Sequence, residues 1–169
     1  MKYTSLAAQD REDLLTSLEA MPDFLRQAFR SLSAAEAATP GPGDAFSPVE
    51  QCWHLADLER EGFAARIQRL LNEDQPLLPD FDGGRLAKER QYLHRALSEG
   101  LSAFAETRRA NLEVLRSMRS EEWARGGTQD GVGPVMLCDI PVMMFQHDNS
   151  HRAEIETWLK SATGRRTRA

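Results

Sequence analysis

The apolar residues of this chain recur every three or four positions over long stretches, the period of a helix that buries one side. Similar stripes run through residues 10–32, 48–72, 85–118 and 139–162. Segments rich in Val, Ile or Thr are missing, and Ala, Leu, Glu, Arg and Gln are abundant, which favours helix over strand. The sequence therefore predicts an all-α fold built on four long helices.

Residues that start or break helices delimit these segments. Ser47-Pro48-Val49-Glu50 is a capping box with proline at the first helical position, so it predicts the start of the second helix. Pro22 should kink or restart the first helix. Pro and Gly content predicts loops at 39–45, 73–84 and 126–133. The middle loop is long for a hairpin, so the second and third helices should run parallel, joined by a crossover.

Length and charge narrow the class of protein. At 169 residues the chain predicts one domain over residues 1–169, large enough to fold without a disulfide or structural metal. Its 21 basic and 26 acidic residues argue against a nucleic-acid binder, which needs a concentrated basic face. No apolar stretch suits a signal peptide or a membrane span, so we expect a cytoplasmic protein.

Cys52 and Cys138 form no C-x-x-C pair and are expected to be small buried residues.

Three of the four histidines form a candidate metal site. His147 and His151 lie four positions apart, which places both imidazoles on one helix face. His54 lies among apolar residues early in the second helix and should face the core, whereas His94 should face solvent. Because facing helices of a bundle commonly build metal sites, we predict that His54, His147 and His151 hold one divalent ion. The alternative is that these rings are ordinary core residues in a buried polar network.

Three neutral nitrogens leave positions open for water or substrate, as in catalytic rather than structural sites. Zinc, nickel, iron, copper and manganese all remain open. Asp57 and Glu154 each follow a histidine by three residues and could accept its second ring proton; Asp57 could also be a fourth ligand.

Asp57 and Asp148 are the candidate catalytic carboxylates. The segment His147-Asp148-x-x-His151 differs from the H-E-x-x-H zinc proteases, because aspartate is one methylene shorter than their general base and the third histidine lies far upstream. Arg108 and Arg109 could hold an anionic substrate if they face inward.

Three segments, taken in order, resemble the DinB-like superfamily: residues 46–57 (FSPVEQCWHLAD), 76–82 (PLLPDFD) and 145–155 (FQHDNSHRAEI). The resemblance extends from about Leu14 to Leu159. It implies a four-helix bundle in up-down-down-up order, a metal triad at His54, His147 and His151, and a homodimer. Some family members use low-molecular-weight thiols such as bacillithiol, mycothiol or glutathione.

The sequence leaves three functional hypotheses. The favoured one is a thiol-dependent S-transferase for a small-molecule substrate, acting in detoxification or stress response. A metal-dependent hydrolase is the second. A stress-associated binding protein without catalysis is the third.

Overall fold

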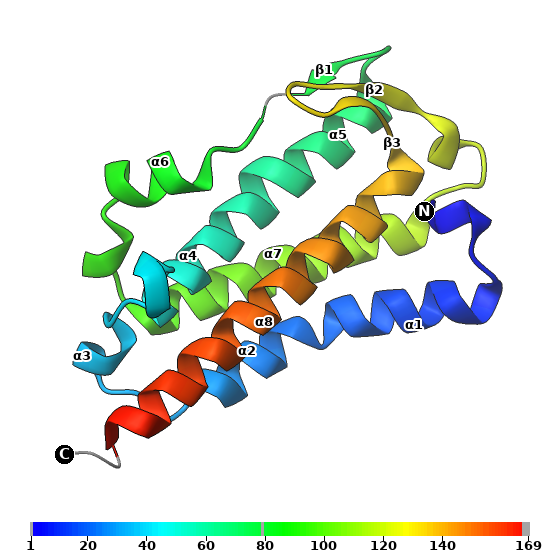
Figure 1. The fold of residues 1–169 in the computed structure, drawn as a ribbon. Coiled ribbons are helices and arrows are strands. Elements are labelled where there is room, and N and C mark those ends of the chain that lie inside the picture. The colour runs from blue at the N-terminus through cyan, green and yellow to red at the C-terminus, as the bar shows by residue number, and fades with distance from the viewer. Residues whose placement is uncertain (1, 79, 167–169) are drawn as a thin grey trace.

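A computed structural model shows four long helices, and describes residues 2–78 and 80–166, with side chains through residue 163 (Figure 1). The long helical segments, in chain order, are α1 (Ala8–Glu19) with α2 (Met21–Phe29), then α4 (Pro48–Asp57) with a π-helical segment (Leu58–Ala64) and α5 (Ala65–Asn72), then α7 (Leu97–Ser117) and α8 (Ile140–Arg166). The shorter helices are α3 (Ala34–Ala37) and α6 (Gly83–Glu89). Single 3₁₀ turns lie at residues 3–5, 42–44, 92–94, 122–124 and 137–139.

The order of the helices is up-down-down-up, as expected. The segment α4–α5 runs parallel to α7, while α1–α2 and α8 run the opposite way (Figure 1). The helix α4 packs on α7, and α1 packs on α8. Gly100 lies in the first of these contacts, where an added Cβ would come 3.1 Å from Cys52 Cβ and 3.2 Å from the Trp53 ring. The absence of a side chain at Gly100 therefore allows α7 to approach α4 closely.

Helix starts follow the sequence signals. Ser47 Oγ accepts from the backbone N–H of Glu50, and the Glu50 carboxylate accepts from that of Ser47 at 2.9 Å. The same reciprocal pair joins Ser33 and Glu36 at the start of α3. Pro22 lies in the first turn of α2, directly after the break from α1. Its missing N–H produces the predicted restart.

The predicted third helix (85–118) is wrong in its first third. The helix α6 ends at Glu89, Gln91 adopts a left-handed conformation with φ 51°, and α7 begins only at Leu97. The break turns two side chains onto buried Asp57: Tyr92 Oη donates to its carboxylate at 2.6 Å and Arg90 Nη1 at 2.5 Å. Satisfying a buried charge outweighs helix propensity here.

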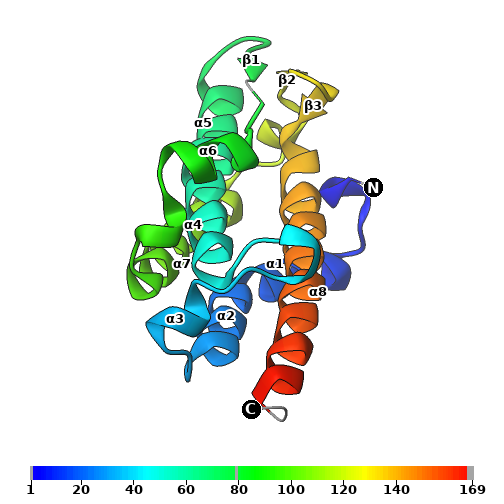
Figure 2. The ribbon, with the colours of Figure 1, turned by 60° about the vertical axis from the view of Figure 1, so that its left-hand side comes forward.

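A small sheet, which the sequence did not predict, takes in parts of two predicted loops and residues 134–136. Strand β1 (Leu77–Leu78) pairs in parallel with β2 (Gly126–Gln129), which pairs antiparallel with β3 (Gly133–Met136). Gly127 allows the close approach of β1, because a Cβ there would lie 2.4 Å from the Pro76 carbonyl oxygen. Arg125 donates to the carbonyls of Leu70 and Glu73, which ties the sheet to the end of α5. The sheet thus closes one end of the bundle (Figure 2).

The core has two apolar clusters. One gathers α1, α5, the sheet and the start of α8; its members include Leu18, Leu58, Leu112 and Met144. The other gathers α2, α4, the start of α7 and the later part of α8; its members include Met21, Leu55, Phe104 and Ile155. No helix among the described residues is long and apolar enough to cross a membrane. A single domain over residues 1–169 stays a prediction.

A buried polar layer centred on Arg108 separates the two clusters. Arg108 is 1% exposed and binds Glu59 through Nε and Nη2, both at 2.9 Å. It binds Asp148 through Nη1 at 2.6 Å and Nη2 at 3.0 Å. Its Nη1 also donates to the Leu18 carbonyl, whose ordinary helical partner would be the N–H that Pro22 lacks. One guanidinium therefore joins α1, the π-helical segment, α7 and α8.

Replacing Arg108 should destabilise the bundle strongly. Arg108→Met leaves two buried carboxylates without their cation, so the unfolding free energy should fall by about 3–5 kcal/mol in urea denaturation at neutral pH. Arg109→Met is the matched control, since Arg109 is exposed and, among the described residues, its ion pair is with exposed Glu113; its effect should stay within about 0.5 kcal/mol. A loss below about 1 kcal/mol for Arg108→Met would show that the layer is not a structural requirement.

Candidate metal centre

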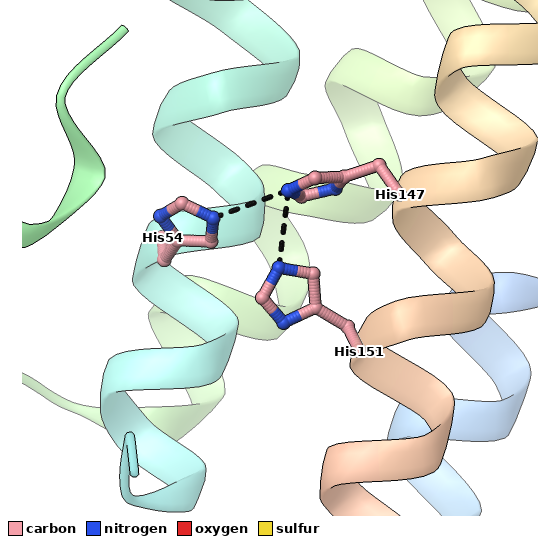
Figure 3. A group of neighbouring side chains, drawn as sticks. All are labelled: His54, His147 and His151. Atoms are coloured by element: carbon pink, nitrogen blue, oxygen red, sulfur yellow. Dashed lines mark hydrogen bonds between the residues drawn. The ribbon is translucent and has the colours of Figure 1, made fainter.

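The three predicted histidines meet between α4 and α8. Figure 3 shows the rings of His54, His147 and His151 pointing toward one another. His147 Nε2 lies 3.3 Å from His54 Nε2 and 3.1 Å from His151 Nε2. One ligand atom from each residue lies within 4.8 Å of the other two. Two segments about ninety residues apart in sequence thus present three imidazole nitrogens to one point.

The spacing of these nitrogens suits a single metal ion. Tetrahedral coordination with nitrogen at about 2.0–2.1 Å places the ligand nitrogens about 3.3 Å apart. Two of the observed separations are 3.3 Å and 3.1 Å. Three imidazoles without a thiolate also match the ligand set that borderline divalent ions prefer.

Gln51 fixes the ring of His151. The His151 Nδ1 lies 2.5 Å from Gln51 Oε1, and Gln51 Nε2 donates to Glu154 at 2.7 Å. Because the amide N–H group points at the carboxylate, the amide oxygen must face the histidine and accept its Nδ1–H. The lone pair of His151 is then on Nε2, which faces the other two histidines. The predicted partner Glu154 lies farther off, 3.4 Å from Nδ1, and acts chiefly through Gln51.

The ring of His54 is held by packing instead. Its Nδ1 is buried and has no hydrogen-bond partner among the described residues. Phe46 and Phe81 pack against it, with ring centroids 5.4 Å and 5.9 Å away. Gly83 closes the contact, because a Cβ there would lie 2.4 Å from Nδ1 and Cε1 of His54. Absence of a side chain at Gly83 is therefore what makes room for the imidazole.

Burial keeps two of the rings neutral. Desolvation, with the neighbouring His151 adding to it, lowers the pKa of His54 to about 4. Desolvation also lowers the pKa of His147 to about 2, aided by His151, His54 and the nearby Arg108. A neutral imidazole keeps the lone pair that a metal needs. Both residues are thus suited to coordination at neutral pH.

Comparison with known proteins agrees with this arrangement. The family model of the DinB superfamily matches residues 17–155, a span that includes all three histidines. The chain belongs to the DinB superfamily.

Individual relatives of this DinB-superfamily chain are distant in sequence. A protein of Geobacillus thermodenitrificans (strain NG80-2) named "Putative metal-dependent hydrolase" is 23% identical over 154 residues, which cover 90% of this chain and 86% of that protein. YfiT from Bacillus subtilis, described as a probable metal-dependent hydrolase with an unusual four-helix bundle topology, superposes with a TM-score of 0.84 at 20% identity, covering 95% of this chain and 91% of YfiT.

A mycothiol-dependent maleylpyruvate isomerase has the same bundle. It superposes with a TM-score of 0.69 at 13% identity and covers 92% of this chain. Only 63% of the isomerase is matched, so the larger protein extends beyond the shared fold. Together the two superpositions confirm the DinB-like four-helix bundle.

The candidate catalytic carboxylates lie outside the cluster of rings. Asp57 is buried and bound by Arg60, Arg90 and Tyr92, so it is not placed as a fourth ligand. Asp148 is bound on both oxygens by Arg108. Neither carboxylate is free to accept a proton from a substrate in this arrangement.

The other candidate side chains are also accounted for. Arg108 faces inward as the substrate hypothesis required, but it is occupied by Glu59 and Asp148. Arg109 is exposed, as is His94, and Cys52 and Cys138 are buried. The substrate-anchoring role foreseen for the arginine pair is therefore not supported by their contacts.

Sequence analysis missed Gln51 and Gly83. Gln51 lies three residues before His54, and that spacing could have indicated it. Gly83 stands in a Gly-Gly pair that was interpreted only as a loop signal. Which of two adjacent glycines makes room for a ring depends on the tertiary packing.

Acidification should destabilise the metal-free protein. In the unfolded chain His54 takes up a proton near pH 6.5, whereas in the folded chain it does so near pH 4. Stability is therefore complete above pH 6.5 and falls as the pH drops toward 4, by up to about 1.4 kcal/mol per pH unit from this residue. Urea denaturation with a chelator present measures this slope. His54→Phe should make the slope less steep, with His147 still contributing to it, and exposed His94→Gln should leave it unchanged. A slope equal in His54→Phe and parent would contradict the assignment.

Gly83→Ala should disturb the His54 ring. The added methyl overlaps Nδ1 and Cε1, so the unfolding free energy of the metal-free protein should fall by about 1–3 kcal/mol. Gly84→Ala is the matched control, because its Cβ would meet nothing closer than 3.7 Å. Equal unfolding free energies for the two variants would contradict this prediction, because they would show that the His54 ring shifts away from residue 83 without cost.

Proposed function

We propose that this protein is a metal-dependent enzyme in which His54, His147 and His151 hold one divalent ion. The convergence of three imidazole nitrogens carries the proposal: they lie within 4.8 Å of one another, and His147 Nε2 is at tetrahedral spacing from both other rings. When bound, such an ion acts as a Lewis acid that lowers the pKa of a thiol or water molecule in its open position. Half-buried His147 gives the cluster contact with solvent, as a site that admits a substrate requires.

The favoured reaction is transfer of an external thiol to an electrophile. Asp57 and Asp148 are both held by arginines, so neither is available as a general base for water. A thiol needs far less activation than water, because its unperturbed pKa is about 8.5 rather than 15.7. The chain's own thiols are unsuited to the role: both are buried, and burial raises the pKa of Cys52. The nucleophile would thus be a small-molecule thiol.

The surroundings of the cluster suit an apolar electrophile. Phe46 and Phe81 flank His54, and the ring of Phe63 lies 6.2 Å from that of His147 in an edge-on arrangement. Aromatic walls exclude water and favour apolar groups near the reacting atoms. A role in detoxification of such compounds is consistent with this lining, and the mycothiol-dependent isomerase shows that the same fold serves thiol chemistry.

Metal-dependent hydrolysis is the second candidate. The names given to the Geobacillus protein and to YfiT favour it. A set of three histidines also serves enzymes that activate water without a carboxylate base. The homodimer remains a prediction from the family resemblance.

Metal content tests the proposal first. Protein purified without an affinity tag and dialysed against zinc, nickel or manganese should hold about one ion per chain by elemental analysis. His147→Ala should lose most of that ion, whereas His94→Ala, which changes the exposed histidine, should retain it. A parent protein that takes up no metal would contradict the proposal and favour a non-catalytic binding protein.

Activity assays then separate the two reactions. The loaded protein is mixed with an alkyl halide and a series of thiols that includes bacillithiol, mycothiol and glutathione, and in parallel with ester and amide substrates. Thiol-dependent loss of the halide that disappears in His147→Ala would support S-transfer. Ester or amide cleavage without added thiol would favour the hydrolase instead.

A further inference from the structure

Arg66, on α5, is a buried cation without a counter-ion. The residue is only 5% exposed to solvent. Among the residues that the structure describes, none forms a hydrogen bond or ion pair with it, and its Nε is buried without an acceptor. Asp80 is the acid whose charge acts on it, from beyond ion-pair distance. Arg66 contrasts with Arg108, whose guanidinium is bound by two carboxylates and a carbonyl.

A guanidinium in this state is costly. Burial of a cation that has no ion pair is unfavourable, and this burial lowers the pKa of Arg66. Contact with the Phe63 ring, whose centroid is 5.7 Å from the guanidinium carbon, offsets part of that cost. The Nε–H of Arg66 is buried without an acceptor, whereas its two Nη nitrogens, which have no partner among the described residues, are in contact with solvent. Such a group is suited to receive an anion from outside the chain.

The position of Arg66 links it to the histidines. Phe63 contacts both groups: its ring lies 5.7 Å from the Arg66 guanidinium carbon and 6.2 Å from the His147 ring centroid. The Arg66 Nη1 reaches back along the helix toward Gly62, where a Cβ would lie 3.9 Å from it. Gly62 lies between Arg66 and His54 in the continuous helical run α4–α5. Asp80 stands next to Phe81, which packs on His54.

From these contacts, and resting on the proposed function, we infer that Arg66 binds the carboxylate of a small-molecule thiol or electrophile whose reacting atom lies at the three histidines. Arginine recognises a carboxylate with two parallel charge-assisted hydrogen bonds, which fixes orientation as well as position. One phenyl ring, that of Phe63, lies against both the Arg66 guanidinium and the His147 ring. This spacing suits a substrate whose carboxylate is a few bonds from the sulfur or carbon that reacts. Arg66 takes the role that the sequence suggested for Arg108 and Arg109.

The test compares two thiols that differ only in charge. Cobalt(II)-loaded protein is titrated with 3-mercaptopropionate and with 3-mercaptopropionamide, and thiol binding is read from the sulfur-to-cobalt absorption band. The parent should bind the carboxylate at least tenfold more tightly than the amide. Arg66→Met should bring this ratio to about one, Arg66→Lys should retain part of it, and Arg109→Met should leave it unchanged.

A second measurement needs no metal and no variant. Propionate is titrated into the parent while the Nε–H resonance of Arg66 is followed by NMR, and a saturable shift supports the inference. A parent that takes up cobalt but binds both thiols equally would overturn the inference and leave the metal site intact. A parent without cobalt would overturn the proposed function, and the propionate titration would still decide the role of Arg66: no shift rejects it.

Discussion

The ion pairs of Arg108 hold the bundle in the form on which the site depends. This buried cation binds Glu59 of the π-helical segment and Asp148 of α8, and it takes the Leu18 carbonyl that Pro22 leaves free. Because Asp148 is bound to Arg108 of α7, the face of α8 that carries Asp148 must point toward α7. This contact sets the rotation of α8 about its own axis. His147 and His151 are thereby turned toward α4. The break between α1 and α2, the π-helical segment after α4 and the rotation of α8 are therefore linked through one side chain.

The parts of the structure that could be predicted are those with a local cause. Apolar residues at helical spacing and the capping box at Ser47 fix where the long helices lie, because both act within a few residues of sequence. The triad was predictable for a related reason: His147 and His151 share a face by spacing alone, and His54 is a polar residue in an apolar stretch. The parallel course of the second and third helices followed from the length of one connection, and the full order of the bundle followed from the family resemblance.

The parts that were missed depend on partners far away in sequence. The break before α7 occurs because Arg90 and Tyr92 turn to Asp57, and nothing between residues 85 and 97 reveals that carboxylate. The sheet joins segments around residues 77, 128 and 134 that are too rich in glycine and proline to predict strands. Gln51 becomes a partner of His151 only after α4 and α8 come together. Unpaired Arg66 cannot be distinguished from its solvated neighbours until every possible acceptor has been placed.

The burial of both cysteines has a consequence for the proposed thiol transfer. A catalyst that brings reactive electrophiles to a thiol would be alkylated first if it carried an exposed thiol of its own. Cys52 is sealed beneath Gly100 and Cys138 lies in the turn before α8, at 0% and 2% exposure. Both sulfur atoms therefore fill apolar space in the core and are not accessible to alkylation in the folded protein. The folded chain could work amid electrophiles that would inactivate a protein with accessible thiols, and its unfolded form would be trapped by them.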